Sequence, residues 1–357
     1  MKQYKMDKQF LKELLTAVSP SGYEGSASNV FTDHMNKVAT FVKRDNAGNT
    51  IFRMGNPDAN AKLMLSAHID EMALQIQNID DKGFLHFVAD GGVDKKVLPG
   101  SHVKIITSSA IIDGVIGKAP IHVEKGDDRN KVLEIKDLKI DIGAESKEEA
   151  AAIVSIGDVA LVHANPVDLG INRIAGRGLD DKAGIFVIAE VAKLLANEEL
   201  KHLCVYFVAC TQEETTATGA IVSASGINPD YSIDFDVTFA TDDEFVNSNE
   251  WGDIKLGKGG AIAHGVNNHP YFTRFIKAVC NKNNIPYQEF IAPAHGTDTV
   301  HIRQSSSNCV TQLLSIPNRN MHTQAEVCDY RDLESLINMT AKTVVALDME
   351  NHGGYPR

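Results

Sequence analysis

The second half of the chain alternates long apolar segments that have a helical period with short segments that are apolar on both faces. The stretch 181–200 repeats apolar residues every three to four positions, and the stretch 201–210 that follows it is almost continuously apolar. Further strands are expected over 235–241 and 309–316, and further helices over 271–284 and 332–349. Buried strands separated by helices predict an α/β fold with a mostly parallel central sheet that is flanked by helices.

The amino-terminal part supplies more elements for the same sheet. Asp7 can cap a first helix, and a second helix is expected over 25–38. Two strands around a tight turn are expected over 41–54, and a short apolar strand over 61–68 ends at His68.

Residues 72–164 have a different pattern, with short β-like segments separated by Gly, Asp and Pro. This pattern predicts a small β-rich domain. A chain of 357 residues is larger than the usual single core. We therefore expect a discontinuous α/β domain made of residues 1–71 and 165–357, with the β-rich domain inserted into it.

Charge and apolar content exclude several classes of partner. The net charge of -12 repels phosphate backbones, and no clustered Lys/Arg stripe reverses this locally, so no nucleic-acid partner is expected. No stretch is apolar enough to span a bilayer or to act as a secretory signal, which predicts a cytoplasmic protein with no membrane partner. The five cysteines lack CxxC spacing and indicate neither a disulfide framework nor a thiolate zinc site.

Acidic and histidine residues follow the predicted strands, where open α/β sheets bind their ligands. His68 ends one strand, and Asp70 is near enough to orient its ring, although a lone histidine here is more often a polar loop residue. Glu213 and Glu214 follow the strand over 201–210. Two adjacent carboxylates leaving a buried strand repel each other unless a cation or a proton compensates their charge.

Other candidates are weak when they are taken singly. They are Asp180, Asp181, Asp236, Asp242, Asp243, His295 and His322. The aspartate pair at 180–181 can be a helix cap, and the others can be solvated loop residues. Together, histidines and carboxylates at one sheet edge match the nitrogen and oxygen ligands of zinc or cobalt. A further carboxylate would then serve as a general base.

Short motifs in a fixed order give this set a more specific meaning. They are PSGYEG, AHIDEM, GRGLDDKAG, TQEE, DVT with a following TDD, HGTDTVHI and IPNRNMHT. Their order, with a β-rich insertion between AHIDEM and GRGLDDKAG, resembles the tetrahedral aminopeptidases. This family of two-metal peptidases includes deblocking, glutamyl and leucyl aminopeptidases, and some members have been labelled as endoglucanases.

The resemblance implies a role for each matching residue. The metal ligands would be His68, Asp180, Glu214, Asp236 and His322. Asp180 would bridge two ions. His68 and Asp236 would hold different ions, but a partition in which His68 shares its ion with Asp180 and either Asp236 or Glu214 stays open. Glu213 would act as the general base and Asp70 would orient His68. The Asp180-Asp181 link is a candidate non-proline cis peptide.

The same resemblance implies a reaction. The chain would be a metallo-aminopeptidase that hydrolyses the first residue of a peptide through a water held between two metal ions and activated by Glu213. Zinc or cobalt is expected, with manganese as an alternative. His295 would be an extra donor near the oxyanion or a structural residue. The loop Thr215–Gly219 departs from the family pattern, so substrate specificity cannot be transferred.

Partners and rival functions also follow. The resemblance implies peptide substrates with a free amino end, and dimers that assemble into a tetrahedral dodecamer through residues 72–164. A lid or a structural appendage is the alternative role for that segment. The competing functions are a related metal-dependent deacylase or amidohydrolase, and a non-catalytic metal-binding assembly protein. Glu213, a base with no other evident duty, argues against the second.

Overall fold

The computed structural model describes residues 5–123, 126 and 131–350. Expectations for residues 1–4 and 351–357, and for a few positions of the insertion, lie outside the described residues. The α-helices are α1 (Lys8–Thr16), α2 (Gly25–Met35), α3 (Lys147–Ala151), α4 (Leu179–Leu195), α5 (Thr218–Ile227), α6 (Ser248–Trp251), α7 (Pro270–Asn283), α8 (Asp298–Ser305) and α9 (Tyr330–Glu350).

The strands fall into three groups. The central sheet contains β1 (Thr40–Arg44), β2 (Thr50–Gly55), β3 (Ala61–His68), β12 (Leu203–Cys210), β13 (Tyr231–Phe239), β14 (Gly260–His264), β15 (Tyr287–Ile291) and β16 (Val310–Asn318). A barrel contains β4 (Ala73–Ile79), β5 (Leu85–Asp90), β6 (His102–Ile106), β7 (Ile111–Ile116), β8 (Ile140–Asp141) and β9 (Val159–Val162). A small sheet contains β10 (Val167–Leu169), β11 (Arg173–Gly176) and β17 (Glu326–Asp329).

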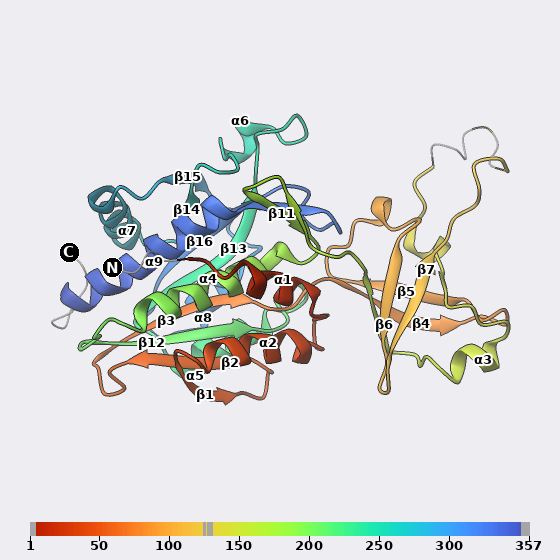
Figure 1. Cartoon of the computed structure of the whole chain (residues 1–357), viewed down its shortest axis with the longest axis horizontal. Helices are drawn as coiled ribbons and strands as arrows, with labels where there is room; N and C mark the ends of the chain where they lie inside the picture. The colour runs from red at the N-terminus through yellow and green to blue at the C-terminus, as the bar shows by residue number, and fades with distance from the viewer. Residues whose placement is uncertain (1–4, 124–125, 127–130, 351–357) are drawn as a thin grey trace.

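The central sheet has the strand order β1-β2-β12-β3-β13-β16-β14-β15. Its four middle strands, β12, β3, β13 and β16, run parallel to one another. β1 and β2 form the predicted antiparallel hairpin, β2 is also antiparallel to β12, and β14 is antiparallel to β16. The predicted α/β fold with a mostly parallel core is confirmed, with antiparallel pairings toward both edges (Figure 1).

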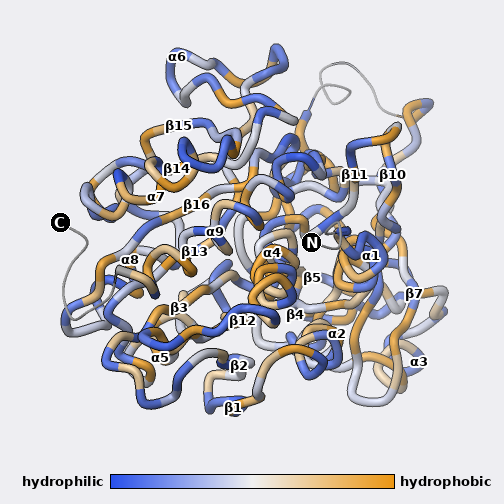
Figure 2. The backbone as a smooth tube through the Cα atoms, turned by 60° about the vertical axis from the view of Figure 1, so that its left-hand side comes forward, coloured by the Kyte–Doolittle hydropathy of each residue, from blue (hydrophilic) through white to orange (hydrophobic). Residues whose placement is uncertain are grey.

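Alternate side chains of the middle strands point to opposite faces of the sheet. Leu63 and Leu65 of β3 join the large core formed with α1, α2, α4 and α9. Met64 of β3 and Val208 of β12 join a second core formed with α5 and α8. This period of two is what a strand covered on both faces requires. Figure 2 shows α4 as a hydrophobic helix, and its side chains are buried almost throughout.

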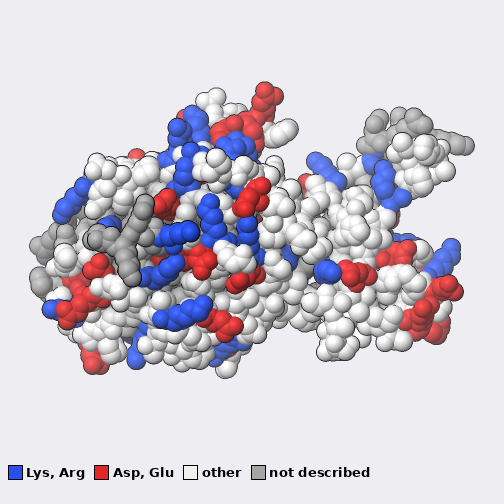
Figure 3. All heavy atoms as spheres, viewed as in Figure 1, with Lys and Arg blue, Asp and Glu red and all other residues white. Residues whose placement is uncertain are grey.

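The strands β4 to β9 close into a barrel with the order β4-β5-β8-β7-β6-β9. The barrel lies to one side of the central sheet and has its own hydrophobic cluster, which includes Leu85, Ile105 and Ile140. On the face drawn in Figure 3, Lys and Arg side chains are interspersed with Asp and Glu over the α/β part and the barrel. Among the described helices, none is long and apolar enough to cross a membrane.

Local signals account for where several elements begin. The Asp7 side chain accepts a hydrogen bond from the Phe10 amide, 3.3 Å away, and α1 begins at the next residue, Lys8, as the cap predicts. β3 ends at His68 as expected.

Four of the five cysteines are buried and Cys309 is partly buried.

Candidate metal centre

Three neighbouring strands bring the candidate residues to one edge of the sheet. His68, the last residue of β3, lies opposite Cys210, the last residue of β12. Glu213 and Glu214 follow β12 after a two-residue gap, and Asp236 lies on β13, the other neighbour of β3. Because these strands are parallel, their carboxyl ends meet at one place, as the sequence predicted.

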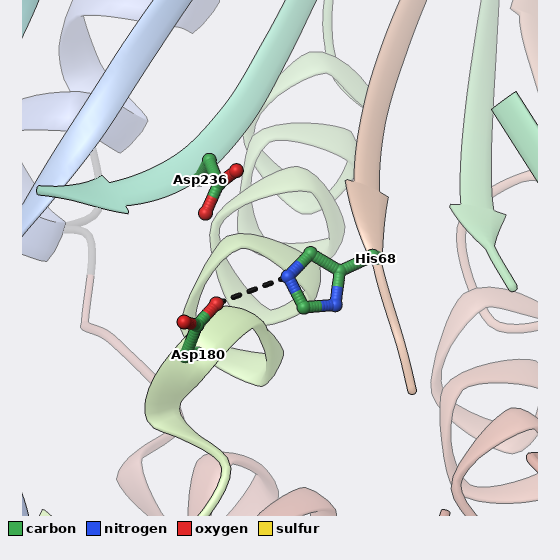
Figure 4. Close-up of side chains that lie close together, drawn as sticks. All are labelled: His68, Asp180 and Asp236. Atoms are coloured by element: carbon green, nitrogen blue, oxygen red, sulfur yellow. Dashed lines mark hydrogen bonds and ion pairs between the residues drawn. The ribbon is translucent and has the colours of Figure 1, made fainter. Parts of the chain in front are cut away.

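One group of potential ligands consists of His68, Asp180 and Asp236, whose ligand atoms all lie within 4.8 Å of one another. Figure 4 shows them converging from β3, the start of α4 and β13. The Nε2 atom of His68 lies 3.0 Å from Oδ1 of Asp180. All three side chains are buried, so their charges are poorly screened by solvent.

A second group consists of Asp180, Glu214 and His322, again within 4.8 Å of one another. Nε2 of His322 lies 3.4 Å from Oδ2 of Asp180 and 3.8 Å from Oε2 of Glu214. The two groups share Asp180, which suits the bridging role expected for it. The grouping of His68 with Asp236 corresponds to one of the partitions that the sequence left open.

The start of α4 gives its two aspartates different surroundings. The peptide bond between Asp180 and Asp181 is cis, as expected. Oδ1 of Asp181 accepts a hydrogen bond from the Gly184 amide at 3.0 Å, so Asp181 acts as the helix cap. Asp180 instead belongs to both ligand groups. The capping interpretation therefore applies to Asp181, and the metal-binding interpretation fits Asp180.

The electrostatics of the buried groups favour added positive charge. Burial raises the pKa of Glu214 and of Asp236 well above their usual values, and the Asp180 carboxylate adds to the effect. Burial would also raise the pKa of Asp180, but hydrogen bonds with His322 and His68 hold it below its usual value. Divalent cations would let all these carboxylates stay ionised, so the donor set fits metal ions.

Glu213 lies beside the first group without belonging to it. Its Oε2 atom is 3.9 Å from Nε2 of His68, and its side chain is 14% exposed. Asp70 accepts hydrogen bonds from the amides of Glu213 at 3.0 Å and Glu214 at 3.2 Å. Nδ1 of His68 lies 3.2 Å from the Asp70 carbonyl oxygen and 3.6 Å from its Oδ1. Asp70 thus contacts His68 as expected and also holds the backbone of both glutamates.

Two residues of the site were not identified from sequence. The buried Glu326 of β17 accepts hydrogen bonds from the amide of Asp180 at 3.0 Å and from that of His322 at 2.9 Å. The carbonyl oxygen of Gly92 lies 3.0 Å from Nδ1 of His322. The pairing of Glu326 with Gly176, just before α4, brings β17 to the site, and this pairing has no local sequence signal.

Three of the other candidates lie outside the two ligand groups. Asp242 and Asp243 pair with Arg319, at 2.8 Å and 3.9 Å, which gives them a structural role. His295 is exposed and lines a cavity of about 370 Å³ that also contains residues of both ligand groups. Its position at this cavity is compatible with the expected role as a substrate donor.

The chain as a whole is similar to known aminopeptidases. A family described as M42 glutamyl aminopeptidase matches residues 48–339. A lysyl aminopeptidase of Pyrococcus furiosus is 32% identical over 342 residues, which cover 94% of this chain and 95% of the relative. An aminopeptidase structure from the archaeon Desulfurococcus kamchatkensis has a TM-score of 0.88 at 32% identity and covers 97% of each chain. The TET1 peptidase of Pyrococcus horikoshii, which can assemble into a tetrahedron or a large octahedral shell, has a TM-score of 0.85 at 32% identity, covering 94% of this chain and 98% of that chain.

Proposed function

This chain belongs to the M42 glutamyl aminopeptidase family and is a metal-dependent aminopeptidase, and from that premise we propose that it removes the first residue of peptides at a centre of two divalent ions. The observation that carries the proposal is the pair of ligand groups that share Asp180. Glu213 lies beside them as a carboxylate that belongs to neither group.

We assign the ligands by their grouping. One ion would be held by His68, Asp180 and Asp236, and the other by Asp180, Glu214 and His322. Mixed nitrogen and oxygen ligands suit zinc or cobalt, with manganese as an alternative. When bound, the two ions would polarise the scissile carbonyl and lower the pKa of a water molecule.

The protein's own groups move the proton and hold the geometry. Glu213 takes a proton at Oε2 from the attacking water and returns it to the leaving amine. Asp70 fixes the backbone on which Glu213 lies, through the hydrogen bond from its amide. His295, at the cavity, is proposed to donate to the oxygen that develops negative charge.

Acidic groups in the cavity support a preference for unblocked peptides. Glu213 and Glu214 line it together with Asp180 and Asp236, so a free amino group meets negative charge there. An acetyl group removes the positive charge of that amine and adds volume at the same place. A deacylase or amidohydrolase would accept the blocked substrate, and a non-catalytic assembly protein would have no need of Glu213.

We also propose that the chain consists of two domains with different roles. Residues 1–71 and 165–357 would form the catalytic domain, and residues 72–164 a dimerisation domain. The separate hydrophobic cluster of the barrel supports this division. Dimers would assemble into a tetrahedral dodecamer, as the similarity to the TET1 peptidase suggests.

Paired peptide substrates test the proposal. Protein loaded with zinc, cobalt or manganese should contain close to two ions per chain and release the first residue of an unblocked peptide. The same peptide with an acetylated amino end should stay intact. Equal cleavage of both peptides would refute the aminopeptidase mechanism proposed here in favour of the deacylase alternative. Absence of cleavage from both peptides, with two ions bound, would favour the non-catalytic alternative.

A further inference from the structure

The cavity beside the metal centre has two chemically different sides. One side consists of four carboxylates and one histidine, namely Asp180, Glu213, Glu214, Asp236 and His322. The other side is formed by the end of β13, by α6, by Leu313 of β16, and by the segment that begins at the end of β15. A substrate whose scissile bond lies at the first side must therefore place its first side chain, or the rest of the peptide, against the second.

The second side is mostly apolar and partly aromatic, with Thr238, His295 and Thr297 as its polar residues. It includes Val237, Phe239, Trp251, Phe290, Ile291 and Leu313. The rings of Phe239 and Trp251 meet edge to face, with centroids 4.9 Å apart. Such pairs hold each other in a defined geometry, so the two rings form a stable wall. The cavity volume of about 370 Å³ lies in the range of small-molecule sites.

No lysine or arginine is found among the described residues that line this cavity. Arg319 follows shortly after β16, but it is not part of the lining, and its Nε and Nη2 atoms lie 2.9 and 2.8 Å from Asp242. The acidic residues of the lining are all metal-ligand candidates or Glu213. A glutamyl side chain would find no lysine or arginine at the apolar side, and a lysyl side chain would find no free carboxylate there.

We propose that this apolar side is the pocket for the first side chain of the substrate and that it selects large uncharged residues, such as leucine, methionine and phenylalanine, over glutamate and lysine. The inference rests on the proposed two-metal aminopeptidase function and adds its substrate class. Burying a charged side chain against apolar walls is costly, whereas burying an aliphatic or aromatic one is favourable. The selectivity therefore differs from the glutamyl and lysyl preferences in the names of the family and of the Pyrococcus furiosus relative.

A panel of amino-acid anilides tests the selectivity on the full-length, metal-loaded protein. We expect kcat/KM for leucine, methionine and phenylalanine anilides to exceed that for the glutamate and lysine anilides by about 100-fold, and that for alanine by about 10-fold. Glutamate or lysine anilides cleaved as well as leucine anilide would overturn the inference while the aminopeptidase function stands. Hydrolysis of none of them would overturn the proposed function and the inference with it.

Two variants locate the pocket. Ile291→Lys places a cation on the wall at a residue that is 79% exposed, so folding should be unaffected. It should raise the glutamate-to-leucine ratio of kcat/KM by about 10-fold. Trp251→Ala should lower kcat/KM for phenylalanine more than for alanine, by about 10-fold.

The matched control is Phe245→Ala. Phe245 lies between β13 and α6, is 89% exposed and is not part of the cavity lining. This variant should leave all ratios within about twofold of the parent protein, as surface substitutions usually do. The pocket assignment is refuted if Ile291→Lys and Trp251→Ala behave like this control.

Discussion

At the scale of single residues, the site depends on groups that touch no substrate. Glu326 uses its two carboxylate oxygens to accept the amides of Asp180 and His322, two of the proposed ligands. Burial raises the pKa of Glu326 to about 8, and the Asp180 charge adds to this. Keeping the Glu326 side chain ionised at this place therefore costs free energy. Its position explains how a loop and a helix start come to share one metal centre.

Replacing Glu326 with glutamine should therefore weaken the metal centre. The amide NH₂ group of glutamine cannot accept one of the two backbone hydrogen bonds, so the ligand attached to that amide loses its fixed position. We expect metal affinity to fall by about 10- to 100-fold, measured by competition with a chelator. Glu334→Gln, at an exposed position of α9, is the control. Equal affinities in the two variants would show that Glu326 does not position the ligands.

Glu71 organises a second buried network beside the site. Its Oε1 accepts hydrogen bonds from Nζ of Lys182 at 2.7 Å and from the Ser19 amide at 3.0 Å, and its Oε2 pairs with Arg177. Burial would raise the pKa of Glu71, but the charges of Arg177 and Lys182 lower it to about 2. The network joins the end of β3 to the start of α4, where Asp180 lies.

Glu71→Gln should destabilise the fold in a pH-dependent way. It leaves two buried cations without their anion, which costs about 3 to 5 kcal/mol of unfolding free energy at neutral pH. Because the folded pKa lies below the ordinary 4.5, the stabilisation by Glu71 is complete above about pH 4.5 and is lost as the pH falls toward 2. Urea unfolding of both proteins between pH 7 and pH 3.5 should show the difference narrowing below pH 4.5.

The control for this series is Glu199→Gln, since the Glu199 side chain is 80% exposed in its ion pair with Lys201. It should change stability by less than about 1 kcal/mol. A Glu71→Gln variant as stable as this control at pH 7 would contradict the proposed role of the network.

At the scale of elements, the sequence predicted those helix and strand ends that depend on neighbouring residues in the chain. Asp7 marks the start of α1, and the end of β3 at His68 follows from the apolar run before it. α5 was not predicted, because its sequence, TGAIVSASGI, is rich in small residues and has no polar face. The contacts of Glu326 were also missed, since they depend on the pairing of β17 with β11, about 150 residues apart in the chain.

The segment after β5 contributes to the metal centre from the barrel side. The Gly92 carbonyl oxygen lies 3.0 Å from Nδ1 of His322. A Cβ atom at Gly92 would lie 2.8 Å from the same Nδ1, closer than such contacts occur. The backbone of Gly92 is not in the left-handed region, so the backbone conformation allows alanine. The obstacle to alanine is a steric clash between its Cβ atom and the ring of His322.

Gly92→Ala should therefore displace His322 and weaken the binding of the ion that His322 is proposed to hold more than the binding of the other ion. A metal titration followed by mass spectrometry should show the affinity for the ion at His322 reduced by about 10- to 100-fold. The ion at His68 should be retained. Gly117→Ala is the matched control in the barrel, because no atom lies within 4 Å of its added Cβ. Parallel loss of both ions, or of neither, would argue against this role of the segment.

At the scale of the whole molecule, the α/β body carries most of the metal centre and the barrel lies beside it (Figure 1). The pattern of apolar segments in the sequence predicted a central sheet with a β-rich insertion. The shape of the substrate cavity was not predicted, because its wall combines residues from β13, α6, β15 and β16 that share no motif. The proposed substrate selectivity therefore rests on the structure and not on the sequence motifs.

The proposed assembly has a direct physical signature. A dodecamer would sediment with about twelve times the mass of the 38.8 kDa chain, as measured by analytical ultracentrifugation. Dimers should appear as the intermediate species at low protein concentration. A single species with the mass of one chain at micromolar concentration would contradict both the dimer and the dodecamer.

The most direct test of the central claim measures metal content and turnover on the same sample of Glu213→Gln. Glu213 belongs to neither ligand group, so the variant should keep close to two ions per chain. Without the carboxylate that accepts the proton, its turnover of leucine anilide should fall by about 10²- to 10⁴-fold. Two retained ions together with normal turnover would contradict the assignment of Glu213 as the base of a two-metal aminopeptidase.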